Sequence, residues 1–168
     1  MLKLALEQEA TFSIDPLEIK KGGVSYTIDT LSCLKQQHPD WELFLILGAD
    51  AFLLMDTWKS SKDILKLCHI LVGTRPGVKL EISMELGRVL GIKTQQLKNN
   101  DFKLPITLNN DTGKTIQLYQ IPTQNISSRK IRDRVQAGKE IKNLLPPAVD
   151  HYIMRHQLYR TEPPPIMV

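Results

Sequence analysis

A glycine and an aspartate, Gly48 and Asp50, directly follow the unbroken apolar run from Leu43 to Leu47. A glycine after a buried strand lets a ligand approach the backbone closely, because it has no side chain in the way. The aspartate can accept hydrogen bonds from ribose hydroxyls or from a metal-bound water. The alternative is a turn glycine followed by an aspartate that caps a helix, and this segment on its own favours that alternative.

Trp58 lies a few residues further along the chain. A tryptophan near the carboxyl end of a strand can stack on a flat heteroaromatic ring, and such stacking contributes about 1–3 kcal/mol to binding. The alternative is a partly buried core tryptophan, which is the commoner role for a single residue of this type.

Two serines and an arginine form a third candidate site, in which Ser127 and Ser128 open a predicted helix and Arg132 lies one turn further on. Serine hydroxyls, the first N–H groups of a helix and its positive dipole end together bind anions. Arg132 can grip the same anion with two N–H groups. The alternative is a serine cap with a solvated basic face, since the stretch from Arg129 to Lys142 holds six basic and two acidic residues. The pattern leaves these two interpretations equal.

A further predicted helix begins near Ser25-Tyr26-Thr27, and its first N–H groups together with Thr27 could hold a carboxylate. The alternative is that Ser25 or Thr27 only caps the helix. The four histidines show no metal-ligand spacing, and the sequence holds no Walker loop, no G-x-S-x-G and no G-x-G-x-x-G. The sequence therefore predicts neither a protein nucleophile nor a metal site.

The segments that position these residues alternate between strand-like and helix-like patterns. Continuous apolar runs indicate strands buried on both faces, which is typical of parallel sheets. The alternation predicts an α/β fold with a doubly wound, Rossmann-like parallel sheet that binds ligands at the carboxyl ends of its strands. The predicted strands are Thr11–Ile19, Leu43–Leu47, His69–Thr74 and Thr115–Ile121. The predicted helical segments are Ser25–His38, Asp50–Trp58, Ser60–Leu67, Glu81–Leu90 and Ser127–Ala137. Ser60 and Asp63 form a predicted capping box, Gly138 follows the fifth of these helices, and Pro146-Pro147 opens a last helix. Lys98–Lys114 is a predicted exposed excursion.

Length and composition limit the choice of class. The 168 residues suffice for one domain, predicted over residues 1–160, followed by a proline-rich tail at 161–168 that we predict to be disordered. The net charge of +4 suits an anionic partner. No nucleic-acid-binding motif is present, and a small phosphate-bearing substrate fits that charge equally well, so we predict no nucleic-acid partner. No apolar run approaches the ~20 residues that cross a bilayer. We therefore predict a cytoplasmic protein without membrane contact, in which Cys33 and Cys68 are reduced, buried and inert.

The candidate segments gain specificity from their order. S-Y-T-x-D-T is followed by an apolar strand into G-A-D, then by T-W, T-R-P-G, I-S-S-x-x-I-R and a closing L-Y-R. This succession resembles the nicotinate-nucleotide adenylyltransferases, over about residues 1–160. Related nucleotidyltransferases share the G-x-D and I-S-S-x-x-I-R pieces, whereas S-Y-T-x-D-T and T-W favour the nicotinate branch.

The resemblance implies an enzyme of NAD biosynthesis that joins ATP, bound with Mg²⁺, to nicotinate mononucleotide. It implies direct transfer without a protein nucleophile. Association into a homo-oligomer is a separate expectation, which follows from the apolar surface that an incomplete sheet leaves exposed. The family pattern has threonine after the paired serines, where this chain has Arg129. The implied site residues are Thr27 and Trp58 for the nicotinate ring, Gly48 and Asp50 for the adenosine ribose, and Ser127, Ser128, Arg132 and Arg75 for the phosphates.

The family opens with a strand, a glycine-rich loop carrying two phosphate-binding histidines, and a helix, and no part of this chain matches that segment. Such a unit needs ~30 residues. We therefore expect the first β-α unit to be missing, with Met1 an internal methionine or the chain a fragment. We further expect an uncovered apolar face or edge and little activity for the chain as given. The alternatives are a nicotinamide-mononucleotide or pantetheine-phosphate adenylyltransferase, or a non-catalytic nucleotide-binding remnant.

Overall fold

The computed structural model describes residues 1–75, 80–92, 105–122 and 126–160. The chain divides into two compact units, one comprising Leu17–Thr123 and the other Met1–Pro16 with Gln124–Val168. The single domain predicted over residues 1–160 stays a prediction, and the predicted disordered tail at 161–168 lies outside the described residues.

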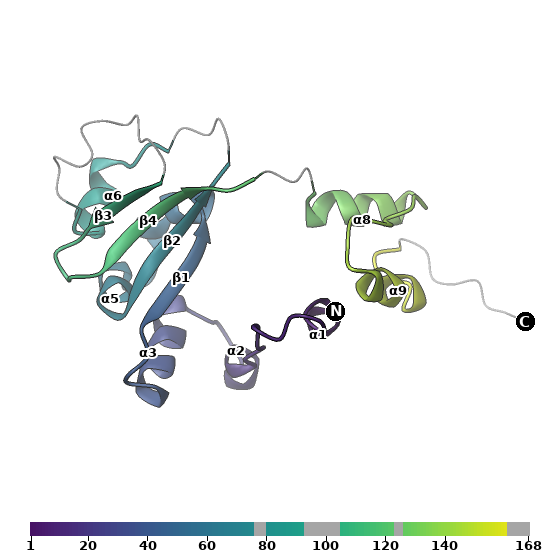
Figure 1. Ribbon diagram of the computed structural model, residues 1–168, viewed down its shortest axis with the longest axis horizontal. Helices are drawn as coiled ribbons and strands as arrows, with labels where there is room; N and C mark the ends of the chain where they lie inside the picture. Colours follow the sequence, from purple (N-terminus) through teal and green to yellow (C-terminus); the bar gives the residue numbers. More distant parts are fainter. Residues whose placement is uncertain (76–79, 93–104, 123–125, 161–168) are drawn as a thin grey trace, which may run out of the picture. The chain divides into compact units, whose positions relative to one another are not determined.

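The unit Leu17–Thr123 is built on a four-stranded sheet in the order β1-β2-β4-β3 (Figure 1). Strands β1 (Leu43–Gly48), β2 (Cys68–Thr74) and β4 (Thr115–Gln120) run parallel, and β3 (Ile106–Asn109) pairs antiparallel with β4. The three parallel strands confirm the predicted Rossmann-like α/β sheet. The predicted excursion at 98–114 is wrong for β3, because Leu108 is buried in the core and the strand completes the sheet edge.

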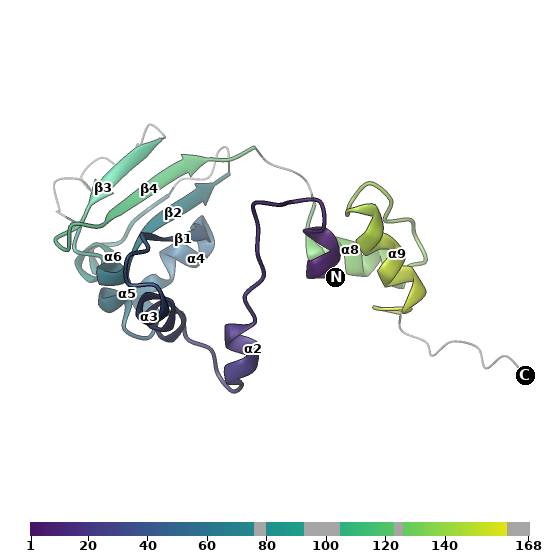
Figure 2. The same ribbon diagram turned by 60° about the horizontal axis from the view of Figure 1, so that its bottom comes forward.

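Helices cover one face of this sheet, and Figure 2 shows α3, α5 and α6 gathered on the same side. The helical segments of the unit are α2 (Leu17–Lys21), α3 (Thr27–Gln37), α4 (Ala49–Leu53), the short 3₁₀ turn η1 (Met55–Thr57), α5 (Ser61–Leu67) and α6 (Met84–Val89). The core between helices and sheet includes Phe52, Met55, Ile64, Leu65, Ile70, Val72, Leu86, Leu90, Ile116 and Leu118.

The other face of the sheet exposes apolar side chains. Burial along β1 alternates, and Phe44 is 48% exposed and Ile46 75% exposed. The prediction that Leu43–Leu47 is buried on both faces is therefore wrong, because the helices of this unit pack on the face that carries Leu43, Leu45 and Leu47. Within the unit Leu17–Thr123, these exposures agree with the expected uncovered apolar face, which stays a prediction for the whole chain.

Two local predictions fail for backbone reasons. The strand predicted over Thr11–Ile19 does not form: residues 12–16 have no regular structure, and Leu17–Lys21 is α2. Alternating apolar residues make a strand only where a neighbouring strand accepts their backbone bonds. The capping box at Ser60 also fails, since Ser60 has a left-handed backbone (φ 54°) instead of the extended one that a capping serine adopts.

The first turn of α3 likewise lacks the predicted cap. The residue before α3 is Tyr26, and no side chain caps the helix there. The predicted roles of Ser25 and Thr27 as caps are therefore wrong. Within the sheet-bearing unit, a serine cap does occur at α6, where Ser83 accepts a hydrogen bond of 3.0 Å from the backbone N–H of Leu86.

The second unit contains α1 (Leu2–Ala5), α8 (Ser128–Gln136) and α9 (Pro147–Arg155) around a small apolar core. The predicted helix ends are confirmed here. Ser127 caps α8, Gly138 follows it with φ 65°, and Pro147 is the first residue of α9. Such a glycine and such a proline suit these positions, because one allows positive φ and the other lacks the N–H that a first turn leaves unpaired. The core consists of Ile131, Val135, Ile141, Val149 and Ile153, with Leu4 and Ala5 packed against it.

Candidate functional site

A cavity of about 340 Å³ opens at the carboxyl ends of β1, β2 and β4. Its lining includes three of the predicted site residues, Gly48, Asp50 and Arg75. The carboxyl ends of parallel strands lie at the same edge of a sheet, and residues from separate segments therefore meet here. Gly73 and Ile121 also line the cavity and were missed, although both lie at the ends of predicted strands.

Two glycines keep this cavity open. A Cβ atom on Gly48 would lie 2.7 Å from Oδ1 of Asp50, and one on Gly73 would lie 3.2 Å from Cδ1 of Ile121. Gly48 has an ordinary extended backbone (φ −75°), so space and not backbone strain makes glycine suitable there. The side chain of Asp50 occupies the volume that a Cβ at residue 48 would need.

The first turn of α3 and the residues around Trp58 form a second cluster in the same unit. Trp58 is half-buried and packs against the core, and Thr27 is the half-buried first residue of α3. Lys59 joins the two: its ammonium nitrogen lies 3.3 Å from Oδ1 of Asp29 and 4.3 Å from the ring centroid of Tyr26. The structure therefore brings the two predicted nicotinate residues into one neighbourhood.

Asp29 is the centre of this cluster. Lys21, the last residue of α2, donates a hydrogen bond of 2.7 Å to Oδ2 of Asp29, while Lys59 holds Oδ1. The hydrogen bond from Lys21 is the main reason that the pKa of Asp29 lies below its ordinary value. Both lysines prefer an ionised partner, so the carboxylate form is favoured. Asp29, Lys21 and Lys59 are not among the predicted site residues, although Asp29 stands inside the S-Y-T-x-D-T segment.

The predicted phosphate-binding serines lie in the second unit, at the start of α8. Ser127 accepts a hydrogen bond of 3.2 Å from the backbone N–H of Lys130, which makes it the cap of the helix. Ser128 and Arg132 are exposed, while Ile131 and Val135 on the opposite side are buried. The helix end thus has the form expected of an anion site. Because it belongs to the other unit, a phosphate site shared with Arg75 stays a prediction.

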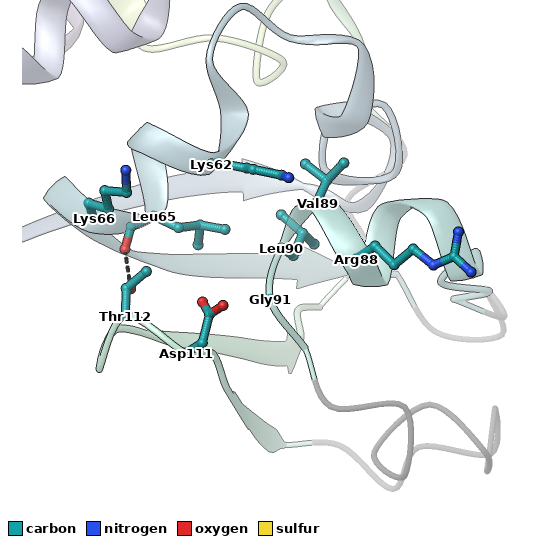
Figure 3. Close-up of a pocket in the computed structure, with 9 residues that line it drawn as sticks. All are labelled: Lys62, Leu65, Lys66, Arg88, Val89, Leu90, Gly91, Asp111 and Thr112. Carbon is teal, nitrogen blue, oxygen red and sulfur yellow. Dashed lines mark hydrogen bonds between the residues drawn. The ribbon is translucent and has the colours of Figure 1, made fainter.

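A second cavity of about 340 Å³ lies at the amino ends of β2 and β4 (Figure 3). Its walls carry Lys62, Lys66, Arg88 and one carboxylate, Asp111. Lys66 is already paired with Asp63 at 2.8 Å, and in Figure 3 Lys66 and Arg88 extend away from Asp111. The charged groups do not converge on one point, so this cavity is a weaker candidate than the one at the carboxyl ends.

Metal sites and membrane-spanning helices are both absent from the described residues. No group of three or more histidine, cysteine or acidic side chains there is placed to hold a metal ion. None of the helices in those residues has the length and apolar character that a membrane-spanning helix needs. Cys33 and Cys68 are both free thiols. Cys68 is buried as predicted, whereas Cys33 is only partly buried, so the predicted burial of Cys33 is wrong.

Comparison with known proteins agrees with this geometry. Residues 1–134 match the family described as cytidylyltransferase-like. A probable nicotinate-nucleotide adenylyltransferase of Synechococcus sp. (strain JA-3-3Ab) is 35% identical over 159 residues, covering 95% of this chain and 67% of the relative. The protein of the same name from Desulfitobacterium hafniense (strain Y51) is 38% identical over 161 residues, covering 95% of this chain and 69% of the relative.

Solved structures show the same fold. The Plasmodium falciparum nicotinic acid mononucleotide adenylyltransferase complexed with APC superposes with a TM-score of 0.54 at 18% identity. That match covers 82% of this chain and 60% of the solved one. The complex of that protein with NaAD gives a TM-score of 0.52 at 18% identity, covering 81% and 58%. The chain thus spans about 60% of the structures and about two thirds of the relatives that it matches. By sequence, fold and motif order, the chain belongs to the cytidylyltransferase-like family and, within it, to the nicotinate-nucleotide adenylyltransferases.

Proposed function

We propose that the protein transfers the adenylyl group of ATP to nicotinate mononucleotide, giving nicotinate adenine dinucleotide and pyrophosphate in NAD biosynthesis. The observation that carries the proposal is the cavity at the carboxyl ends of the parallel strands, lined by Gly48, Asp50 and Arg75. The cluster of Thr27, Trp58 and Lys59 in the same unit supplies a place for a pyridine ring. Both substrates are small phosphate-bearing molecules, and we place the reaction in the cytoplasm.

The reaction is an in-line transfer. A phosphate oxygen of nicotinate mononucleotide attacks the α-phosphorus of ATP, the bond from that phosphorus to the bridging oxygen breaks, and pyrophosphate leaves with both electrons of the bond. Nucleophile and leaving group are both phosphate oxygens, so no protein nucleophile is needed. Holding the two substrates in line can lower the barrier by ~7–11 kcal/mol.

The protein's own residues then bind and orient the substrates. Gly48 admits the adenosine close to the backbone, and Asp50 accepts hydrogen bonds from the ribose hydroxyls. Arg75 contributes charge toward the phosphates in the unit Leu17–Thr123. In the other unit, the capped start of α8 with Arg132 offers N–H donors to an anion. Mg²⁺ belongs to the ATP substrate, whose phosphate oxygens are its natural ligands, and it leaves with pyrophosphate.

Recognition of the pyridine ring follows from donors and stacking. The first-turn N–H groups of α3 near Thr27 are donors, and a carboxylate only accepts hydrogen bonds, whereas a carboxamide also presents two N–H donors. If the N–H donors of a carboxamide face these helix N–H donors, the buried groups stay unpaired, which costs about 1–3 kcal/mol of binding free energy. This cost corresponds to a preference of about 5- to 150-fold for the acid over the amide. Trp58 stacks on either ring equally, so we expect it to set affinity and not choice.

Replacement of Trp58 tests this assignment, and Trp41 provides a matched control. Loss of a stacking partner removes about 1–3 kcal/mol, so Trp58→Ala should raise the KM for nicotinate mononucleotide about 5- to 150-fold. The ratio of acid to amide turnover should stay nearly constant. Trp41 is 52% exposed and stacks on His38, remote in sequence from the cluster, so Trp41→Ala should leave both parameters unchanged.

The measurement is pyrophosphate release from ATP with nicotinate mononucleotide, nicotinamide mononucleotide or pantetheine phosphate as acceptor. A preference of the wild-type protein for the amide or for pantetheine phosphate would contradict the proposed substrate. A collapse of the acid-to-amide ratio in Trp58→Ala would show that stacking is not the role of this side chain.

A further inference from the structure

We propose that Lys59 is a specificity-determining residue: its ammonium group, held against the first turn of α3 by Asp29 and by the ring of Tyr26, selects a pyridine nucleotide that carries a ring carboxylate. This inference rests on the proposed function, because it requires the pyridine ring to bind at Trp58. Asp29 stands inside the S-Y-T-x-D-T segment, but neither Asp29 nor Lys59 is among the predicted site residues.

Two contacts fix the ammonium group of Lys59 in place. It lies 3.3 Å from Oδ1 of Asp29, which is one turn into α3, and 4.3 Å from the ring centroid of Tyr26, the residue that precedes Thr27. Its own backbone follows directly after Trp58. These contacts join residues about 30 positions apart in the chain, so they hold the residues around Trp58 against the first turn of α3. Lys59 therefore follows the residue assigned to the ring and contacts the residues on either side of Thr27 in the chain, which is assigned to the ring substituent.

The charge of Lys59 remains available because Asp29 has a closer partner. Lys21 approaches the carboxylate to 2.7 Å, whereas Lys59 stays at 3.3 Å from its other oxygen. Two ammonium groups thus face the one carboxylate of Asp29, and these three groups together keep a net charge of +1. The Lys59 side chain is 48% exposed, so an incoming anion can reach it without displacing the core.

A lysine ammonium group is a donor with a full charge and has three N–H groups. A carboxylate carries a full negative charge that this ammonium group attracts, whereas a carboxamide is neutral and lacks that attraction. Because the site is half-exposed, we expect a moderate preference for the acid from Lys59, about 3- to 10-fold. Asp29 acts here as a positioning residue, since it works through Lys59.

The test compares Lys59→Met with Lys62→Met, a neighbouring exposed lysine that lines the cavity at the other end of the sheet. Steady-state pyrophosphate release is measured with nicotinate mononucleotide and with nicotinamide mononucleotide. Lys59→Met should raise the KM for the acid about 3- to 10-fold at nearly constant kcat and leave the amide unchanged, whereas Lys62→Met should change neither. Lys59→Arg should keep most of the preference for the acid. Asp29→Asn should lower that preference, as Lys59→Met does.

Ionic strength gives a second readout that needs no folded variant. A charge-based preference should shrink in wild-type protein as salt rises, because exposed charges are screened over about 8–10 Å at 0.1–0.15 M salt. An equal loss for acid and amide in Lys59→Met, or an acid preference that is indifferent to salt, would overturn the inference while leaving the proposed function intact. If the wild-type protein prefers the amide, the proposed function and this inference are both rejected.

Discussion

The variant Gly48→Ala tests whether Gly48 acts by leaving room for the side chain of Asp50. The backbone of Gly48 (φ −75°, ψ 156°) is allowed for alanine. The added Cβ would lie 2.7 Å from Oδ1 of Asp50, closer than a Cβ atom tolerates, so the carboxylate must turn away. Asp50 is exposed, and moving its side chain costs about 1 kcal/mol. Alanine in place of glycine before the first turn of α4 costs about another 1 kcal/mol.

The expected loss of unfolding free energy is therefore about 2 kcal/mol, or about 4–8 °C in Tm for a chain of this size. The effect on ATP should be larger. A displaced carboxylate can no longer accept the ribose hydrogen bonds, which are worth about 1.5–3 kcal/mol when one partner is charged. ATP should then bind about 10- to 150-fold more weakly.

A double-mutant cycle with Asp50→Ala decides whether Gly48 acts through Asp50. ATP affinity of the double variant should equal that of Asp50→Ala alone, and in that background Gly48→Ala should cost only the capping part, about 1 kcal/mol. Urea denaturation and ATP titration followed by tryptophan fluorescence measure the two quantities. Gly73→Ala is the matched control, because its Cβ would meet the exposed tip of Ile121 at 3.2 Å and no carboxylate. Independent, additive losses of ATP affinity in the cycle would refute the reasoning.

Three further predictions concern stability and reactivity. Gly91 has φ 62°, and a Cβ there would collide with the carboxylate of Asp111, so Gly91→Ala should lower the unfolding free energy in urea by at least ~1–2 kcal/mol, with part recovered in an Asp111→Ala background. Burial raises the pKa of the Cys68 thiol to about 11, so at pH 8 roughly one thiol in a thousand is ionised, and a thiol reagent should label Cys33 first and Cys68 only after unfolding. The lowered pKa of Asp29 means that its ion pairs stabilise the fold above the unfolded pKa of about 3.9, and that this contribution is lost as the pH falls through the lower folded value. Urea denaturation between pH 2 and 6 should therefore show a shallower acid-side loss of stability for Asp29→Asn, and an unchanged slope would contradict the role of the two lysine pairs.

The sequence by itself determined the features that depend on a few neighbouring residues. Continuous apolar runs located β1 and β2, because short uninterrupted apolar runs are typical of strands, although only one face of β1 is covered by the helices of its unit. Ser127, Gly138 and Pro147 marked helix ends, because the backbone at those positions admits few residue types. The same local logic put Gly48 and Asp50 at a strand end, where the cavity lies.

Only the tertiary structure decided which segments meet. The antiparallel pairing of β3, the exposure of Phe44 and the lining role of Gly73 all depend on partners distant in sequence. The pairing of Lys59 with Asp29 across 30 positions belongs to the same class. The type of a charged or apolar residue does not identify the residue that it contacts, because any suitable group that the fold brings within reach gives a similar contact energy. Local pattern therefore specified the elements, and the packing of those elements on one face of the sheet specified the site.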